Sequence, residues 1–535
     1  QQTATQQLNI SGDLVNQGRI ISQGQQTLAA ARLQNDAGAL VQGETANISS
    51  LSLVNQGIIN SSSLALAANS AQSSGHIQAQ QLNINARQFN LLDGMVYQSG
   101  ADGRFNFSGE NLLIAGGLLA ADGATKVNVS GDIQNNANWL TTGNASINAV
   151  NIINSGTLQL LAGADVTADT LNNSGNMLFA GEQAAALNIS KTLDNQAGLL
   201  QFSGDATLSG ATVNNDGGQI YHLGQGELLL KAAGQLSNRS GEILSNGSTQ
   251  LSAALIENQQ GTLSAEQLAL NATNINSQAG NIQAGLLDIT AQQLNNQQGS
   301  IAALGESGQS LQLNISDTLD NSQGFILAKG QQLSLSTKQL INDQGSLLLS
   351  GADGLTINAS GQLRNQQGLI HSGGGLLLNT PLLNNNQGEL SARDINISAA
   401  TLNNRQGVIG AQQVTLDGAY LDNRAGNIGA FSAAGHNLTL NFSQAIDNSA
   451  QGIIQSAADV AVITSRQLNN TDGNIVLAGS NGSLQVSATT LQNQQGQIQT
   501  NGQLLLTADD VQNQAGYIAA QGDVSINATS VNNSA

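Results

Sequence analysis

The chain has 535 residues, of which 40% are hydrophobic, 9% are charged and only 2% are aromatic, so any core must be aliphatic. The formal net charge is −19, and the 15 Lys and Arg residues are spread thinly along the chain. No basic patch can therefore neutralise several phosphates, which argues against nucleic acid as a partner. The absence of Cys excludes a disulfide framework, thiolate metal ligands and a cysteine nucleophile.

The apolar stretches are short. The longest, residues 112–121, is about half of what a membrane-spanning helix requires. We therefore expect a chain that does not span a membrane.

A motif of the form Leu-x-Asn-x-x-Gly-x-Ile-x-Ala, followed by a loosely spaced Leu-x-Leu-x-Ala, recurs throughout the sequence. It is clear in LQNDAG (33–38), LNNSG (171–175), LNNQQG (294–299), LRNQQG (363–368), LNNRQG (402–407) and VQNQAG (511–516). About 25 copies follow one another between residues 14 and 531, mostly about 19 to 26 residues apart. A repeat of this length predicts a solenoid.

The apolar positions within each copy alternate with polar ones, as in LQLNI (311–315), LSL (333–335) and LTI (355–357). This period of two indicates strands, and the Gly and Asn in every copy disfavour helices. The order of Leu and Asn does not fit leucine-rich repeats. We therefore predict an all-β, right-handed parallel β-helix of about 25 coils, roughly 20 residues per coil, with three short strands in each coil.

The repeated Asn is predicted to point into the core, because it lies two residues after an inward Leu on the same strand. A buried amide needs partners, and copies stacked in register supply them as a ladder in which each Asn donates to the next coil. The candidates for this ladder are Asn35, Asn55, Asn296, Asn342, Asn404 and Asn423. The Gly three residues later is expected to form a corner with positive φ.

The repeat divides the chain into three parts. Residues 1–87 and 139–535 are predicted to form regular coils, whereas residues 88–138 form degenerate coils with a protruding loop, continuous with the same solenoid. In this region Leu91 replaces the expected Asn. An alternative is a binding site built on Phe105, Phe107 and Arg104. Wider spacing at residues 299–324 and 426–452 predicts two further loops.

Residues with catalytic or metal-binding chemistry are sparse and scattered. The histidines, His76, His222, His371 and His436, are far apart and lack ligand spacing, so we expect no metal and no cofactor. The one modest cluster of charges is Asp93, Asp102, Arg104 and Glu110. We expect no enzyme; a β-helical polysaccharide lyase remains a distant alternative. Asn-x-Ser triplets, as at residues 9–11 and 396–398, are weak signals of glycan attachment.

The repeats LNNQQGSIAA, LNNRQGVIGAQQVTL and LQNQQGQIQTNGQLLLTA resemble the haemagglutinin repeats of filamentous haemagglutinin-like exoproteins, and this resemblance covers nearly the whole chain. It implies a β-helical filament exported by two-partner secretion through an outer-membrane β-barrel transporter. The implied location is the extracellular face of the outer membrane of a Gram-negative bacterium.

The resemblance implies two alternative functions. In contact-dependent growth-inhibition effectors, such a region is a rigid stalk that presents a receptor-binding or toxin region at a distance from the cell. In filamentous adhesins, the rod itself binds host cells or glycans. Either function implies a receptor on a target bacterium or a host cell as a partner.

Overall fold

The computed structural model describes residues 5–431, 437–457, 459–479 and 482–534. Over these ranges the chain forms strands and turns without a helix, from β1 (Gln6–Asn16) to β46 (Val524–Asn532). The chain divides into two compact units, Gln1–Glu266 and Gln267–Ala535. No helix long and apolar enough to cross a membrane occurs within the described ranges.

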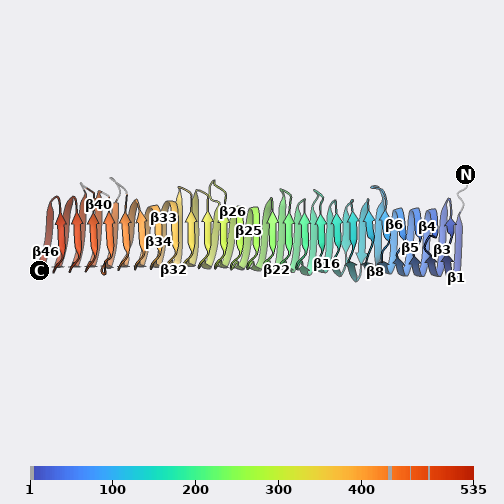
Figure 1. The fold of residues 1–535 in the computed structure, drawn as a ribbon, viewed down its shortest axis with the longest axis horizontal. Helices are drawn as coiled ribbons and strands as arrows, with labels where there is room; N and C mark the ends of the chain where they lie inside the picture. The colour runs from blue at the N-terminus through green and yellow to red at the C-terminus, as the bar shows by residue number, and fades with distance from the viewer. Residues whose placement is uncertain (1–4, 432–436, 458, 480–481, 535) are drawn as a thin grey trace. The chain divides into compact units, whose positions relative to one another are not determined.

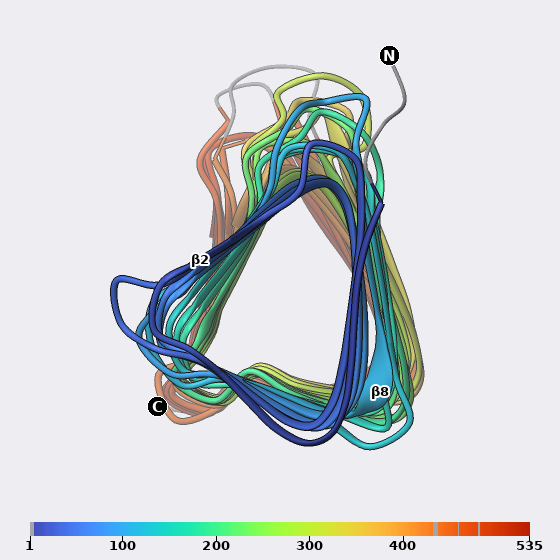
Figure 2. The same ribbon diagram turned by 90° about the vertical axis from the view of Figure 1, so that its right-hand side faces the viewer.

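Each unit is a parallel β-solenoid, and the chain makes about 26 coils of about 20 residues. Figure 1 shows the strands of each unit standing side by side, and in Figure 2 the coils trace a three-sided outline. The connections are right-handed, as expected for parallel strands joined by crossovers. The predicted fold class is confirmed.

A typical coil contains a short strand and a long, bent strand. In unit 2 these are β35 (Val408–Ala411) and β36 (Gln413–Asp422). The pairing of β36 with the next long strand, β38 (Asn437–Asp447), shifts register between Gly418 and Tyr420, where the strand turns a corner. The strand predicted at Leu-x-Leu-x-Ala and the strand predicted at the following Leu-x-Asn are therefore one continuous strand through this bend.

The core of each coil is aliphatic, as the composition predicts. Three successive strand segments each contribute one side chain to it: Leu402, Ile409 and Leu416. All three side chains are 0% exposed. Ile409 of β35 pairs with Ile428 of β37 (Asn427–Ala430), so like residues stack on like. These side chains are buried only when coils stack, because the side chains of a single coil would be open to solvent above and below.

The repeated asparagines form the predicted ladder. Asn404 donates from Nδ2 to Oδ1 of Asn423, at 2.7 Å, and accepts from Nδ2 of Asn385, also at 2.7 Å. The same bond, 2.6 to 2.8 Å long, continues through unit 2 along Asn296, Asn321, Asn342, Asn365, Asn385, Asn404, Asn423, Asn448, Asn470, Asn493, Asn513 and Asn533. The donor always lies in the earlier coil, as predicted.

In unit 1 the ladder has two stretches, because the asparagine is replaced in the intervening coils. One stretch contains Asn16, Asn35 and Asn55, and the other runs from Asn135 to Asn258. Between them Ser73, Leu91 and Ile114 occupy the ladder position in register. Strands β6 (His76–Leu91), β8 (Arg104–Ile114) and β11 (Asp132–Asn135) nevertheless continue the parallel pairing through residues 88–138.

The explanation for the repeated Gly was wrong. In unit 2 the positive φ lies one residue earlier, at Gln406 (54°) and Ala425 (55°), and Gly407 is not among the residues with positive φ. A Cβ on Gly407 would lie 2.2 Å from the carbonyl oxygen of Asn385 and 2.6 Å from Oδ1 of Asn404. Gly is therefore required because the ladder passes directly beside it. In unit 1 the repeated Gly itself has positive φ at Gly38 (79°), and so does Gly117 (72°), three residues after Ile114.

The first predicted loop is confirmed. Residues 304–310 leave the strand pattern between β27 (Ser300–Ala303) and β28 (Leu311–Asp320), and residues 306–309 are exposed. The second predicted loop includes residues 432–436, which lie outside the described ranges.

Candidate binding groove

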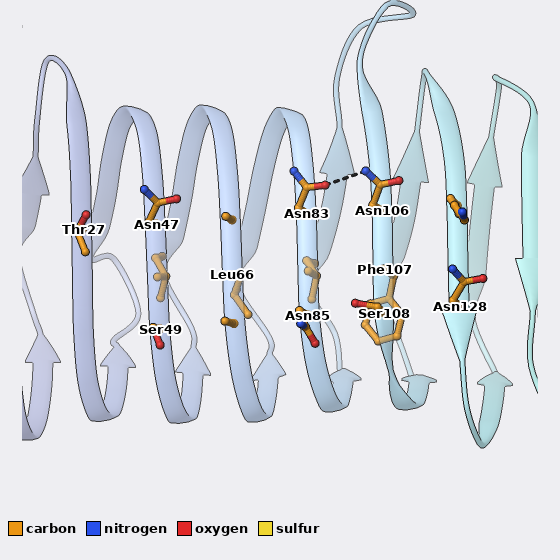
Figure 3. A pocket seen from close by; sticks show the side chains of 15 residues that line it. Thr27, Asn47, Ser49, Leu66, Asn83, Asn85, Asn106, Phe107, Ser108 and Asn128 are labelled. Atoms are coloured by element: carbon orange, nitrogen blue, oxygen red, sulfur yellow. Dashed lines mark hydrogen bonds between the residues drawn. The ribbon is translucent and has the colours of Figure 1, made fainter.

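A groove of about 460 Å³ lies on the outer face of unit 1 (Figure 3). It spans the long strands of successive coils: β3 (Gln25–Asn35), β4 (Leu40–Asn55), β5 (Ile58–Ser73), β6, β8 and β10 (Ala124–Val129). The groove therefore crosses the strands, and its lining repeats from coil to coil.

The alternation of side chains along each strand determines the lining. Inward residues such as Ile48 and Ile84 pack in the core, while the residues on either side of them point outward. Register then aligns the outward residues in two rows: Asn47, Ala65, Asn83 and Asn106 in one, and Ser49, Ala67, Asn85 and Ser108 in the other.

The hollow results from a contrast in side-chain size. Ala65 and Ala67 of β5 are short, and the amides of β6 and the polar side chains of β4 flank them. Asn106 donates from Nδ2 to Oδ1 of Asn83 at 2.7 Å, which fixes the orientation of both amides (Figure 3). Lys126 is the one charged residue among the described lining residues.

This lining can bind a ligand but offers no obvious nucleophile or acid–base pair. Amides and hydroxyls both donate and accept hydrogen bonds, so the groove can pair with polar groups of either kind. A second hollow of about 530 Å³ lies in unit 2. Gly354 and Gly375 of adjacent coils have no side chains there, which leaves a depression in the outer face. Hollows therefore occur on the outer face of each unit.

The predicted aromatic site is not formed. Phe105 and Phe107 are 1% and 2% exposed, because both occupy inward positions of β8. The ring of Phe107 meets that of Phe89 edge to face, with centroids 6.1 Å apart, so these aromatics fill the core where the asparagine ladder is interrupted. Phe107 contributes only to the floor of the groove, and Arg104 alone of the three is exposed.

The predicted charge cluster is dispersed. Glu110 forms an ion pair with Arg87 of the preceding coil, and Arg104 lies between Gln81 and Ala124 in the register. Asp93 lies at a corner after β6, and Asp102 lies in the turn before β8. No hydrogen bond or ion pair joins any two of Asp93, Asp102, Arg104 and Glu110, all of which are described.

The three histidines that the structure describes remain apart. His222 is buried, with Nδ1 2.9 Å from Oγ of Ser245 and Nε2 3.1 Å from the carbonyl oxygen of Gly204. Burial lowers the pKa of His222, opposed by the Gly204 carbonyl and by the charge of Asp205. His76 and His371 each contact one polar side chain, and His436 lies outside the described ranges.

Where the structure describes the chain, no group of three His, Asp or Glu side chains could hold a metal ion. The groove was not predicted, although its Asn-x-Ser triplets at residues 47–49 and 106–108 were visible in the sequence. Only the register between coils shows that they lie together.

The fold and its repeated surface define a class: a parallel β-solenoid built from tandem repeats, with shallow hollows on its outer face. The haemagglutinin repeat model matches residues 3–72, 180–240, 244–323, 310–367, 361–441, 432–481 and 479–535. The chain therefore belongs to the haemagglutinin-repeat family, as its repeats predicted, and these repeats fit a filamentous adhesin-like exoprotein. Such repeats are typical of secreted surface adhesins, which fits an extracellular location.

No curated protein and no solved structure matches the chain. The stretches that match the family model leave out residues 73–179. All of β6, β8 and β10 falls within this unmatched part, as do Ser73, Leu91 and Ile114, which replace the asparagine there. The groove therefore lies partly where the chain departs from its own repeat.

Proposed function

We propose that this region is a rigid extracellular stalk of a large surface-exposed exoprotein exported by two-partner secretion. In this role it holds a receptor-binding or toxin region at a distance from the cell, as in contact-dependent growth inhibition. The observation that carries the proposal is the continuous stacking in unit 2, where the asparagine ladder runs from Asn296 to Asn533 and aliphatic residues stack on their own copies from coil to coil.

Stiffness follows from this packing. Each coil is bonded to its neighbours by backbone pairing on every side and by the ladder at one corner. Bending a unit would open these bonds on one side, and an opened buried amide costs about 1 to 3 kcal/mol. A stack of such coils is therefore suited to hold a distance rather than to change shape.

The absence of Cys and the stacking of coils are also compatible with export of an unfolded chain. The chain has no Cys that could crosslink it before it is outside. Each coil that has emerged can stack on the previous one, and the free energy of stacking then favours outward movement. The partners in this proposal are an outer-membrane β-barrel transporter and a receptor on a target cell.

The proposal is tested with Ile409→Asp, which places a carboxylate in the core of one coil. We expect export of the residues that follow to stall, measured as the fraction of chain that external protease reaches on intact cells. The matched control is Asn396→Asp, because Asn396 is exposed on β34 (Glu389–Asn403) and the added charge is the same. Equal export of both variants would contradict folding-driven export.

A second candidate function, direct adhesion, is favoured by the groove on unit 1. Its test is binding of residues 1–535 to cells, compared with a variant in which Ala65→Phe and Ala67→Phe fill the hollow. Both positions point outward, so the core is left intact. Adhesion that is unaffected by filling the groove would argue against this candidate.

A further inference from the structure

A second ladder runs along the outside of the same corner in unit 2. Six glutamines, each directly before the repeated Gly, are joined Nε2 to Oε1 by five hydrogen bonds of 2.7 to 3.0 Å. All six are exposed. We call this set the glutamine ladder: Gln298, Gln323, Gln344, Gln367, Gln387 and Gln406.

The backbone alone does not explain these glutamines. Each has φ between 54° and 57°, in the left-handed region that costs most residues about 1 to 2 kcal/mol and that Gly adopts freely. Gly217 occupies the equivalent position in unit 1, with φ of 62°. A run of glutamines at strained positions indicates that the side chains themselves are used.

The ladder leaves half of its hydrogen-bonding capacity unused. A primary amide has two N–H donors and two acceptor lone pairs, and the ladder takes one of each. The remaining donors and acceptors face solvent at the spacing of the coils, about 4.8 Å. Where two β-stacks pair, identical side chains of the two stacks interdigitate, and glutamine ladders along each stack add to the stability of the interface.

Charge at this corner permits a close approach despite the net charge of −19. Asp343 pairs with Arg364, and Asp422 pairs with Arg405 and Arg424. Asp320 accepts hydrogen bonds from Gln297 and Ser322. The carboxylates beside the glutamine ladder therefore already have partners within the same chain.

We infer that unit 2 binds a second copy of this chain, with the two glutamine ladders face to face. A second copy is the occupant because it presents the same amides at the same spacing, so every contact made at one coil is repeated at the next. Contacts that are weak singly become effective when they are linked in this way. This pairing goes beyond the stalk function, because it joins stalks side by side.

The test is sedimentation equilibrium of residues 1–535, in which pairing raises the mass from 54.7 kDa to twice that value. The ladder variant carries three added charges: Gln344→Glu, Gln367→Glu and Gln387→Glu. The control variant carries the same change at exposed positions of unit 2 away from the ladder: Gln467→Glu, Gln485→Glu and Gln503→Glu.

We expect the control to pair like the unaltered chain and the ladder variant to pair at least about tenfold more weakly. If the Glu variant fails to fold, a variant with Gln→Gly at the same three positions tests the inference instead. Gly adopts the positive φ there without strain and removes the side-chain amides. That variant is also expected to pair at least about tenfold more weakly than the unaltered chain. The inference is overturned if the unaltered chain is monomeric throughout, or if ladder and control variants pair equally, as association at another surface would produce.

Discussion

Asn385 donates a hydrogen bond from Nδ2 to Oδ1 of Asn404 at 2.7 Å, although the two residues are nineteen apart in the sequence. Both side chains are fully buried. The same Nδ2 also donates to the carbonyl oxygen of Gly388 at 3.2 Å, so each amide is bonded both within its own corner and to the next coil. Removing one asparagine therefore disturbs three coils.

Asn404→Ala is expected to lower the free energy of unfolding by about 1 to 3 kcal/mol, because it leaves buried partners in the preceding and following coils without their bonds. The measurement is urea unfolding followed by circular dichroism. Asn403→Ala is the control, because Asn403 is the neighbouring asparagine at the end of β34 and is only half-buried. It should change stability by less than about 0.5 kcal/mol. Equal midpoints for the two variants would rule out a stabilising ladder.

Gly407→Ala and Gln406→Gly should have opposite consequences. At Gly407 an added methyl group would lie 2.2 Å from the Asn385 carbonyl oxygen, so the coil must shift and stability should fall by about 1 to 3 kcal/mol. At Gln406 the φ of 54° suits Gly, so Gln406→Gly should cost little or stabilise. Thermal unfolding of both variants checks the pair. A larger loss at Gln406 would mean that the positive φ matters less than the glutamine ladder.

His222 should make unit 1 less stable in acid. Burial lowers the pKa of His222 in the folded chain, so the unfolded chain takes up its proton first. Stability is therefore complete above the unfolded pKa of about 6.5 and falls as the pH drops from there through the lower folded value. His222→Asn should remove this part of the pH dependence, as followed by melting temperature between neutral and acidic pH.

The partner of His222 provides the control. Nε2 faces a carbonyl oxygen and must donate, so in the neutral ring Nδ1 accepts from the hydroxyl of Ser245. Ser245→Ala should reduce stability at every pH while leaving the acid-dependent part in place. If the melting temperature of the unaltered chain falls no more steeply in acid than that of His222→Asn, the imidazole does not contribute to acid sensitivity.

The strands and the asparagine ladder were predictable because both depend on a spacing of two residues within a strand and on one repeated letter. The role of Gly407 was not, since the motif does not show which residue of the corner has positive φ. The glutamine ladder was missed for the same reason. The groove depends on which outward residues lie beside Ala65 and Ala67, and this follows only from the register between coils of unequal length.

Tolerance to insertion should differ sharply between the loop and the corner. Two residues, Gly-Ser, inserted after Ser307 lengthen an exposed loop, and lengthening a loop costs only about 0.6 kcal/mol per doubling. The same insertion after Arg405 separates Asn404 from Gly407. Gly407 lies directly beside the carbonyl oxygen of Asn385, and this contact requires a corner of fixed length. We expect a loss of more than about 2 kcal/mol there, as buried amides lose their partners. Urea unfolding distinguishes the two, and equal stability would mean that corner length does not set the repeat.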